Sequence, residues 1–208
     1  MIKRTGQTAT EALRDFGLLG RHTVLAHSNF ITDSDMEVIA ADGAGIAHCP
    51  LSNIYFSKAV FPLRRALEKS IHVGLGTDIS GGPSASMFDT CRYAISASRM
   101  LEDGVDATAD SSGRGVEGSR IDFCEAFYLA TAGGAKVLDL QVGRFEDGCA
   151  FDAILIDPEA VSAPIRINEE FDTPDDQLQK IVNNATRANI AKVWVHGKIV
   201  VDSNTTNV

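Results

Sequence analysis

The sequence has no long apolar run and no basic run, and each absence excludes a class of protein. No apolar stretch approaches the roughly 20 residues of a transmembrane helix, and the polar start MIKRTGQTATE is not a signal peptide. The formal net charge is −9, and the pair Arg64-Arg65 is too short to make a basic patch. This balance disfavours nucleic acid or an anionic membrane as the main partner. We therefore expect a soluble cytoplasmic protein.

Closely spaced cysteines and nucleophile motifs are also missing. Cys49, Cys91, Cys124 and Cys149 are widely separated and form no C-x-x-C pair, which excludes zinc-ribbon and thioredoxin-like spacings. We expect them to be buried, reduced thiols. There is no G-x-S-x-G elbow, so nucleophilic catalysis finds little support. The 44% apolar and 23% charged fractions are those of an ordinary globular protein, with one domain or a domain plus a fragment.

Three short apolar runs are each followed by a helical pattern, and the pattern after the second run starts near Pro62. The runs are 23–27 (TVLAH), 45–50 (GIAHCP, stopped by its proline) and 72–78 (HVGLGTD). Thr32 and Asp35 form a capping box after the first run. Strand and helix in alternation predict parallel βα units, in a barrel or a doubly wound sheet. Further elements are expected as a helix at 86–101, a loop at 102–120, a helix from the Asp122/Glu125 capping box to about Leu138, a strand at 151–157, a helix near 175–189 and a hairpin across His196-Gly197.

Polar side chains stand where these strands end, and ligands of parallel sheets bind there. Asp78 is the strongest candidate, because a carboxylate at a buried strand end is costly unless it is paired or metal-bound; the alternative is a capping or turn aspartate. His27 ends the first strand, and a functional role and a structural one are equally open. His48 also fits a satisfied core histidine. The glycines of SGGPSAS, residues 80–86, suit either an anion cradle or a turn before a helix.

The motifs resemble one family. VLAHS, GIAHCPLSN and VGLGTDISGG are similar to strands six, seven and eight of the (β/α)8 barrel of the metal-dependent amidohydrolase superfamily. GTDISGGPSASMFD resembles the guanine deaminase branch, and Cys149 departs from the usual lysine. The implied fold is α/β: residues 1–145 form the C-terminal part of the TIM-type barrel, strands 6–8 with their helices. Residues 146–208 form the return strand, connection and hairpin of a small β-domain.

The resemblance also implies a site. Asp78 would be a ligand of a catalytic zinc and hydrogen-bond the attacking water, and His27 would lie near that water and the departing amine. A bound zinc lowers the pKa of its water to about 7. The expected reaction converts guanine to xanthine and ammonia.

Much of that site has no counterpart in the sequence. The family's H-x-H pair occurs nowhere in it, and the strand-five histidine and its glutamate should lie upstream of Thr8. A catalytic zinc takes about three protein ligands. We therefore expect this chain to be the C-terminal half of such an enzyme and to be inactive without the N-terminal half. We expect it to associate either with that half or with further copies of itself, as a homo-oligomer. Two alternatives stay open: another zinc aminohydrolase or chlorohydrolase of heterocycles, and a non-catalytic fragment that self-associates.

Overall fold

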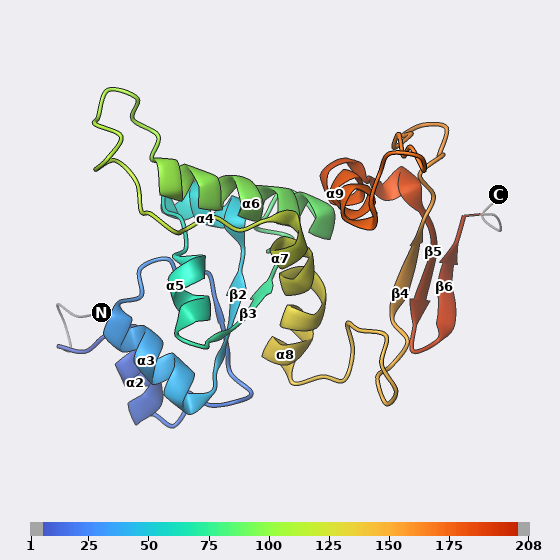
Figure 1. The fold of residues 1–208 in the computed structure, drawn as a ribbon. Helices are drawn as coiled ribbons and strands as arrows, with labels where there is room; N and C mark the ends of the chain where they lie inside the picture. The colour runs from blue at the N-terminus through green and yellow to red at the C-terminus, as the bar shows by residue number, and fades with distance from the viewer. Residues whose placement is uncertain (1–5, 204–208) are drawn as a thin grey trace.

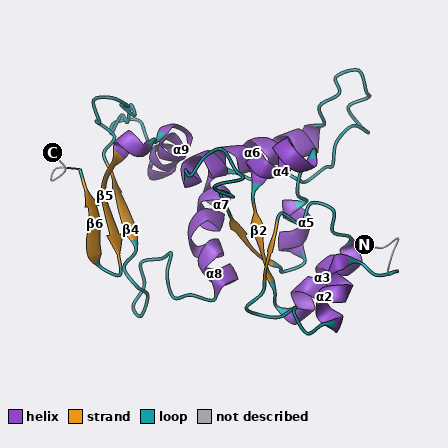
Figure 2. Cartoon of the chain, turned by 180° about the vertical axis from the view of Figure 1, so that it is seen from behind, coloured by secondary structure: helices purple, strands orange, loops and turns teal. Residues whose placement is uncertain are grey.

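A computed structural model describes residues 6–203 as an α/β structure with two separate sheets (Figures 1 and 2). Within those residues, no helix is both long and apolar enough to cross a membrane. The elements along the chain are α2 (Ala9–Asp15), β1 (Val24–Ala26), α3 (Asp33–Asp42), β2 (Gly45–His48), α4 (Pro50–Ser57), α5 (Leu63–Glu68), β3 (His72–Leu75), α6 (Met87–Asp103), α7 (Phe123–Tyr128), the π-helical turn η1 (Leu129–Gly133), α8 (Gly134–Leu138), β4 (Ala153–Ile156), α9 (Pro174–Asn184), the 3-10 turn η2 (Arg187–Asn189), β5 (Ile190–Val195) and β6 (Lys198–Asp202).

The first sheet is parallel and has the order β1-β2-β3. Its strands fall inside the three apolar runs, so the prediction of successive βα units is confirmed. The register pairs Leu25 with Ile46 and Ile46 with Val73, which places all three strand ends on one side of the sheet. In Figure 1, α4 and α6 lie at this side.

Two helices were not predicted. Pro50 was interpreted as the stop of a strand, but it is also the first residue of α4, a position where its missing N–H costs nothing. α2 begins with a capping box in which Thr8 and Glu11 satisfy each other's backbone N–H groups. The expected helix near 175–189 is α9, which ends at Asn184 before the separate turn η2.

The helix predicted from Asp122 to Leu138 is present as one continuous run of α7, η1 and α8. Asp122 and Glu125 form the predicted capping box. The run packs on β2 and β3, and it can approach closely because two glycines meet there. A Cβ atom on Gly74 would lie only 2.7 Å from the Cα of Gly134. The π-helical turn η1 immediately precedes this contact.

The core lies between the parallel sheet and the helices on its two faces. Its largest fully buried side chains include Met36 and Ile39 of α3, Ile46 of β2, Phe61 and Leu129. The apolar face of α3, the helix that Thr32 caps, therefore packs inward, as the spacing of its apolar residues predicts.

The second sheet is antiparallel with the order β4-β5-β6. The predicted hairpin is present, and its turn residues His196 and Gly197 both have positive φ angles, 49° and 73°, as a type I′ turn requires. Apolar side chains on both outer strands of this sheet are about half exposed, among them Ile154 and Val200. A domain boundary near residue 145 stays a prediction.

All four cysteines are free thiols. Cys49 and Cys91 are buried, as expected, and Cys149 is intermediate. The expectation is wrong for Cys124, which is exposed because it lies on the outward side of α7.

Candidate functional site

The two residues chosen from the sequence lie opposite each other at the carboxyl ends of the parallel strands. His27 directly follows β1, and Asp78 comes three residues after β3. His27 Nε2 is 4.0 Å from Asp78 Oδ2, and both side chains are partly exposed, at 40% and 32%. Their strands, β1 and β3, lie on either side of β2 in the sheet. Two residues that are 51 positions apart in the sequence therefore come within ion-pair distance. The predicted convergence of these two side chains is present.

Both residues have a left-handed backbone. The φ angles are 64° at His27 and 54° at Asp78, a region in which histidine and aspartate are over-represented among the non-glycine residues. The N–H of His27 still donates to the carbonyl of Ala47 (3.0 Å), which extends the β1-β2 ladder by one bond before the chain turns. The carbonyl of Asp78 accepts from the N–H of Gly82 in a tight turn. The turns bring both side chains together beyond the carboxyl ends of the strands.

A third residue, Asn53 of α4, joins His27 to His48. Asn53 Oδ1 lies 2.9 Å from His27 Nδ1, and Asn53 Nδ2 lies 3.3 Å from His48 Nδ1. Asn53 is completely buried. Asn53 is not among the candidate residues predicted from the sequence, although it is the last residue of the motif GIAHCPLSN. The available signal was its place one helical turn beyond a strand end.

His48 is a core histidine, as one of the two sequence interpretations has it. It is 2% exposed and packs on Phe61 with ring centroids 5.1 Å apart. Burial, followed by the proximity of His27, lowers the pKa of His48 to about 3. The ring is therefore neutral at physiological pH and accepts the hydrogen bond from Asn53.

Cys49 stands beside these groups but is a poor nucleophile. Burial, and to a smaller extent the nearby charge of Asp78, raises the pKa of the Cys49 thiol to about 11. A thiolate is the reactive form, so the thiol is inert at neutral pH. The structure thus gives Cys49 a packing role beneath Gly76, whose added Cβ would lie 3.1 Å from the sulfur.

The SGGPSAS segment is a turn that leads into a helix. Ser86 caps α6 by accepting from the N–H of Asp89 (3.2 Å), and Ser84 donates to the Asp89 carboxylate (2.6 Å). Gly82 is required because an added Cβ would lie 2.2 Å from the carbonyl oxygen of Thr77. These polar groups satisfy one another, which supports the turn interpretation over an anion cradle.

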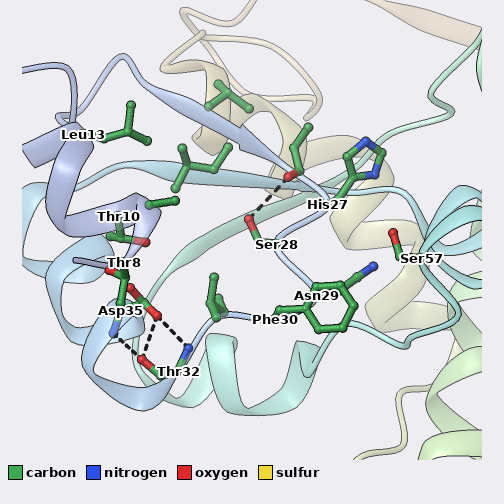
Figure 3. A pocket seen from close by; sticks show the side chains of 15 residues that line it. Thr8, Thr10, Leu13, His27, Ser28, Asn29, Phe30, Thr32, Asp35 and Ser57 are labelled. Atoms are coloured by element: carbon green, nitrogen blue, oxygen red, sulfur yellow. Dashed lines mark hydrogen bonds between the residues drawn. The ribbon is translucent and has the colours of Figure 1, made fainter. Parts of the chain in front are cut away.

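A cavity of about 640 Å³ opens on the other side of His27, along β1, which is an edge strand of the parallel sheet among the described residues (Figure 3). Asp78 does not line it. Both polar ends of Asn29 are buried here without a hydrogen-bond partner among the described residues. The lining comes from the chain around α2, from β1 and the turn after it, and from α3 and α4: Thr8, Ala9, Thr10, Leu13, Val24, Leu25, Ala26, His27, Ser28, Asn29, Phe30, Ile31, Thr32, Asp35 and Ser57.

Donor atoms for a metal are present but few. Asp78 offers a carboxylate, and His27 an imidazole nitrogen, on facing turns. Across residues 6–203, no group of three His, Cys, Asp or Glu side chains is close enough to hold one ion. The described residues therefore supply part of a catalytic zinc site, which needs about three protein ligands and an open position.

The fold and site define an α/β protein whose polar side chains converge at the carboxyl ends of parallel strands. The model of the amidohydrolase family matches residues 1–200. The chain belongs to the amidohydrolase family.

Individual relatives agree with this assignment. The chain is 35% identical over 189 residues to guanine deaminase of Mus musculus, covering 88% of this chain and 39% of that protein. The crystal structure of guanine deaminase from C. acetobutylicum with bound guanine superposes with a TM-score of 0.76 at 28% identity, covering 96% of this chain and 44% of that one. Zinc-complexed atrazine chlorohydrolase from Arthrobacter aurescens shares the fold, with a TM-score of 0.76 at 21% identity over 97% of this chain and 41% of that one. The chain thus spans about two fifths of the length of these relatives.

Proposed function

We propose that this chain carries strands six to eight of a (β/α)8 amidohydrolase barrel and contributes His27 and Asp78 to a zinc-dependent guanine deaminase. The observation that carries the proposal is the 4.0 Å approach of His27 Nε2 to Asp78 Oδ2 at the carboxyl ends of β1 and β3. The likeness to guanine deaminases supports the choice of substrate. The reaction is guanine plus water to xanthine plus ammonia.

The spacing of the two side chains suits a shared water. At 4.0 Å the nitrogen and oxygen are too far apart to hydrogen-bond each other. One water can lie within about 2.8 Å of both. Asp78 then accepts one proton of this water while the water oxygen attacks C2 of guanine. His27 holds the water in line. The proton taken by Asp78 passes to the amino group, which leaves as ammonia, and the second proton of the water ends on the ring nitrogen N3 of xanthine.

Zinc fits this donor set only in part. A bound zinc supplies Lewis-acid activation of the water, and Asp78 is the described residue that would ligate it. The other ligands have to come from polypeptide outside the described residues, either continuous with this chain or separate from it. Within residues 6–203, β1 is an edge strand of the parallel sheet, and this edge and the cavity beside it are where further strands of the barrel would pack.

The test combines zinc content with a guanine-to-xanthine absorbance assay. The purified chain is compared with a fusion that places the N-terminal part of a bacterial guanine deaminase before it. We expect little zinc and no turnover for the chain alone, and about one zinc with guanine turnover for the fusion.

Three results would count against parts of the proposal. Stoichiometric zinc and turnover in the chain alone would show that its own residues complete the site. A folded, zinc-loaded fusion without turnover would refute the deaminase assignment. Turnover of a chlorinated triazine in preference to guanine would move the substrate to the chlorohydrolase alternative.

A further inference from the structure

We infer that Asn53 and the buried His48 form a positioning relay that keeps the side-chain proton of neutral His27 on Nδ1 and presents Nε2 to Asp78. The inference deepens the proposed function and rests on it for its catalytic consequence. The relay itself follows from three buried or half-buried groups on the ends of β1, β2 and the first turn of α4.

The direction of each hydrogen bond follows from which atoms carry hydrogen. An amide nitrogen only donates and an amide oxygen only accepts. Asn53 Nδ2, at 3.3 Å, therefore donates to His48 Nδ1, which has to be the unprotonated nitrogen of that ring. Asn53 Oδ1, at 2.9 Å, accepts from His27 Nδ1, which has to carry hydrogen.

Burial makes this polarity hold. Asn53 is fully buried and His48 is 2% exposed, so neither can exchange its partner for water. The low pKa of His48 keeps its ring neutral, and only a neutral ring can accept at Nδ1. The Asn53 amide bridges the two rings, so a rotation that broke either bond would leave a buried polar group without its partner.

The consequence for His27 concerns which nitrogen reaches the site. With Nδ1–H bound to Asn53, the lone pair of neutral His27 lies on Nε2, the atom 4.0 Å from Asp78 Oδ2. Any proton that His27 takes from a water or returns to a leaving amine then passes through Nε2. A second group that selects the tautomer of a reactive histidine is a general device for aiming it.

The experiment is long-range ¹H–¹⁵N NMR of the full chain labelled in its five histidines, at pH 8, with His27 assigned from a His27→Asn spectrum. We expect His27 as the Nδ1–H tautomer and His48 as the Nε2–H tautomer. In Asn53→Leu, the Nδ1–H signature of His27 should be lost in favour of Nε2–H, the form that free histidine prefers in water. Asn53→Asp keeps an acceptor for His27, so it should restore the Nδ1–H form.

Ser52→Ala is the matched control. Ser52 is the neighbour of Asn53 on α4 and equally buried, but its hydroxyl has no hydrogen-bond partner among the described residues. Its loss should leave the His27 tautomer unchanged.

The inference is overturned if His27 is Nε2–H in the unaltered chain, or if Asn53→Leu and Ser52→Ala give the same His27 spectrum. The unaltered chain alone gives a decisive reading should Asn53→Leu fail to fold. The readout needs neither zinc nor turnover. An Nδ1–H His27 in the chain therefore supports the relay even where the zinc-loaded fusion fails to hydrolyse guanine, which is the result that refutes the proposed function.

Discussion

Gly74 of β3 and Gly134 of α8 meet backbone to backbone, and a Cβ on Gly74 would lie 2.7 Å from the Gly134 Cα. The contact seats the α7-η1-α8 run on the sheet whose strand ends carry the site. The two atoms nearest to an added methyl group are backbone atoms of Gly134, so the helix has to shift.

Gly74→Ala should lower the free energy of unfolding by about 1–3 kcal/mol, the usual cost of overpacking a core. Urea denaturation followed by circular dichroism measures the loss. Gly20→Ala is the control, because nothing lies within 4 Å of a Cβ at that position. Equal stability of the two variants would show that the helix gives way freely.

Asp78→Asn should abolish guanine turnover in the completed enzyme, with a fall in kcat of about 10³-fold, because the amide cannot accept the water's proton. Steady-state kinetics with the fusion protein measures this. Asp139→Asn is a matched control: Asp139 has nearly the same backbone (φ 57° against 54°) but lies at the end of α8 and pairs with Arg21. A similar loss in both variants would mean that Asp78 acts through the fold.

His48 makes stability depend on pH. Its folded pKa of about 3 lies below the unfolded value of 6.5, so between these values the unfolded chain binds more protons. The stability that the neutral His48 contributes to the folded chain is therefore fully present above pH 6.5. As the pH falls from 6.5 towards 3, the free energy of unfolding decreases by at most about 1.4 kcal/mol per pH unit.

Urea denaturation of the chain and of His48→Gln from pH 7 to pH 4 tests this. The unaltered chain should lose stability more steeply than the variant. His22→Gln, which alters an 83% exposed ring, should keep the steep slope. Parallel slopes for all three proteins would contradict the buried, neutral His48.

The edge of β1 should drive self-association of the isolated chain. Among the described residues β1 pairs only with β2, and Val24 is 40% exposed. Unpaired strand edges attract other strands, and a lysine placed on them blocks this. Sedimentation velocity should show oligomers that Val24→Lys weakens at least about tenfold, whereas Val161→Lys, 99% exposed in the connection before α9, should not. Monomers at all concentrations would rule out this edge as an interface.

Local signals in the sequence predicted much of the fold. The capping boxes of Thr32 and Asp122 predicted where α3 and α7 begin. The missed helix α4 shows the limit of such signals, because Pro50 is compatible both with the end of a strand and with the first turn of a helix. Whether a helix starts at Pro50 directly after the strand depends on the packing of α4 against α6, which is a long-range contact.

Local patterns along the chain were enough to predict the order of the strands and of the helices other than α2 and α4, the hairpin turn at His196-Gly197 and the polar residues at the strand ends. These features depend on neighbours a few positions apart. The approach of His27 Nε2 to Asp78 Oδ2 at 4.0 Å and the link through Asn53 from His27 to the buried His48 became visible in the folded chain alone. Those relations arise from the parallel pairing of β1, β2 and β3 and from the seating of α4 on their ends. Such approaches between distant segments are set by burial and packing, which no local pattern encodes.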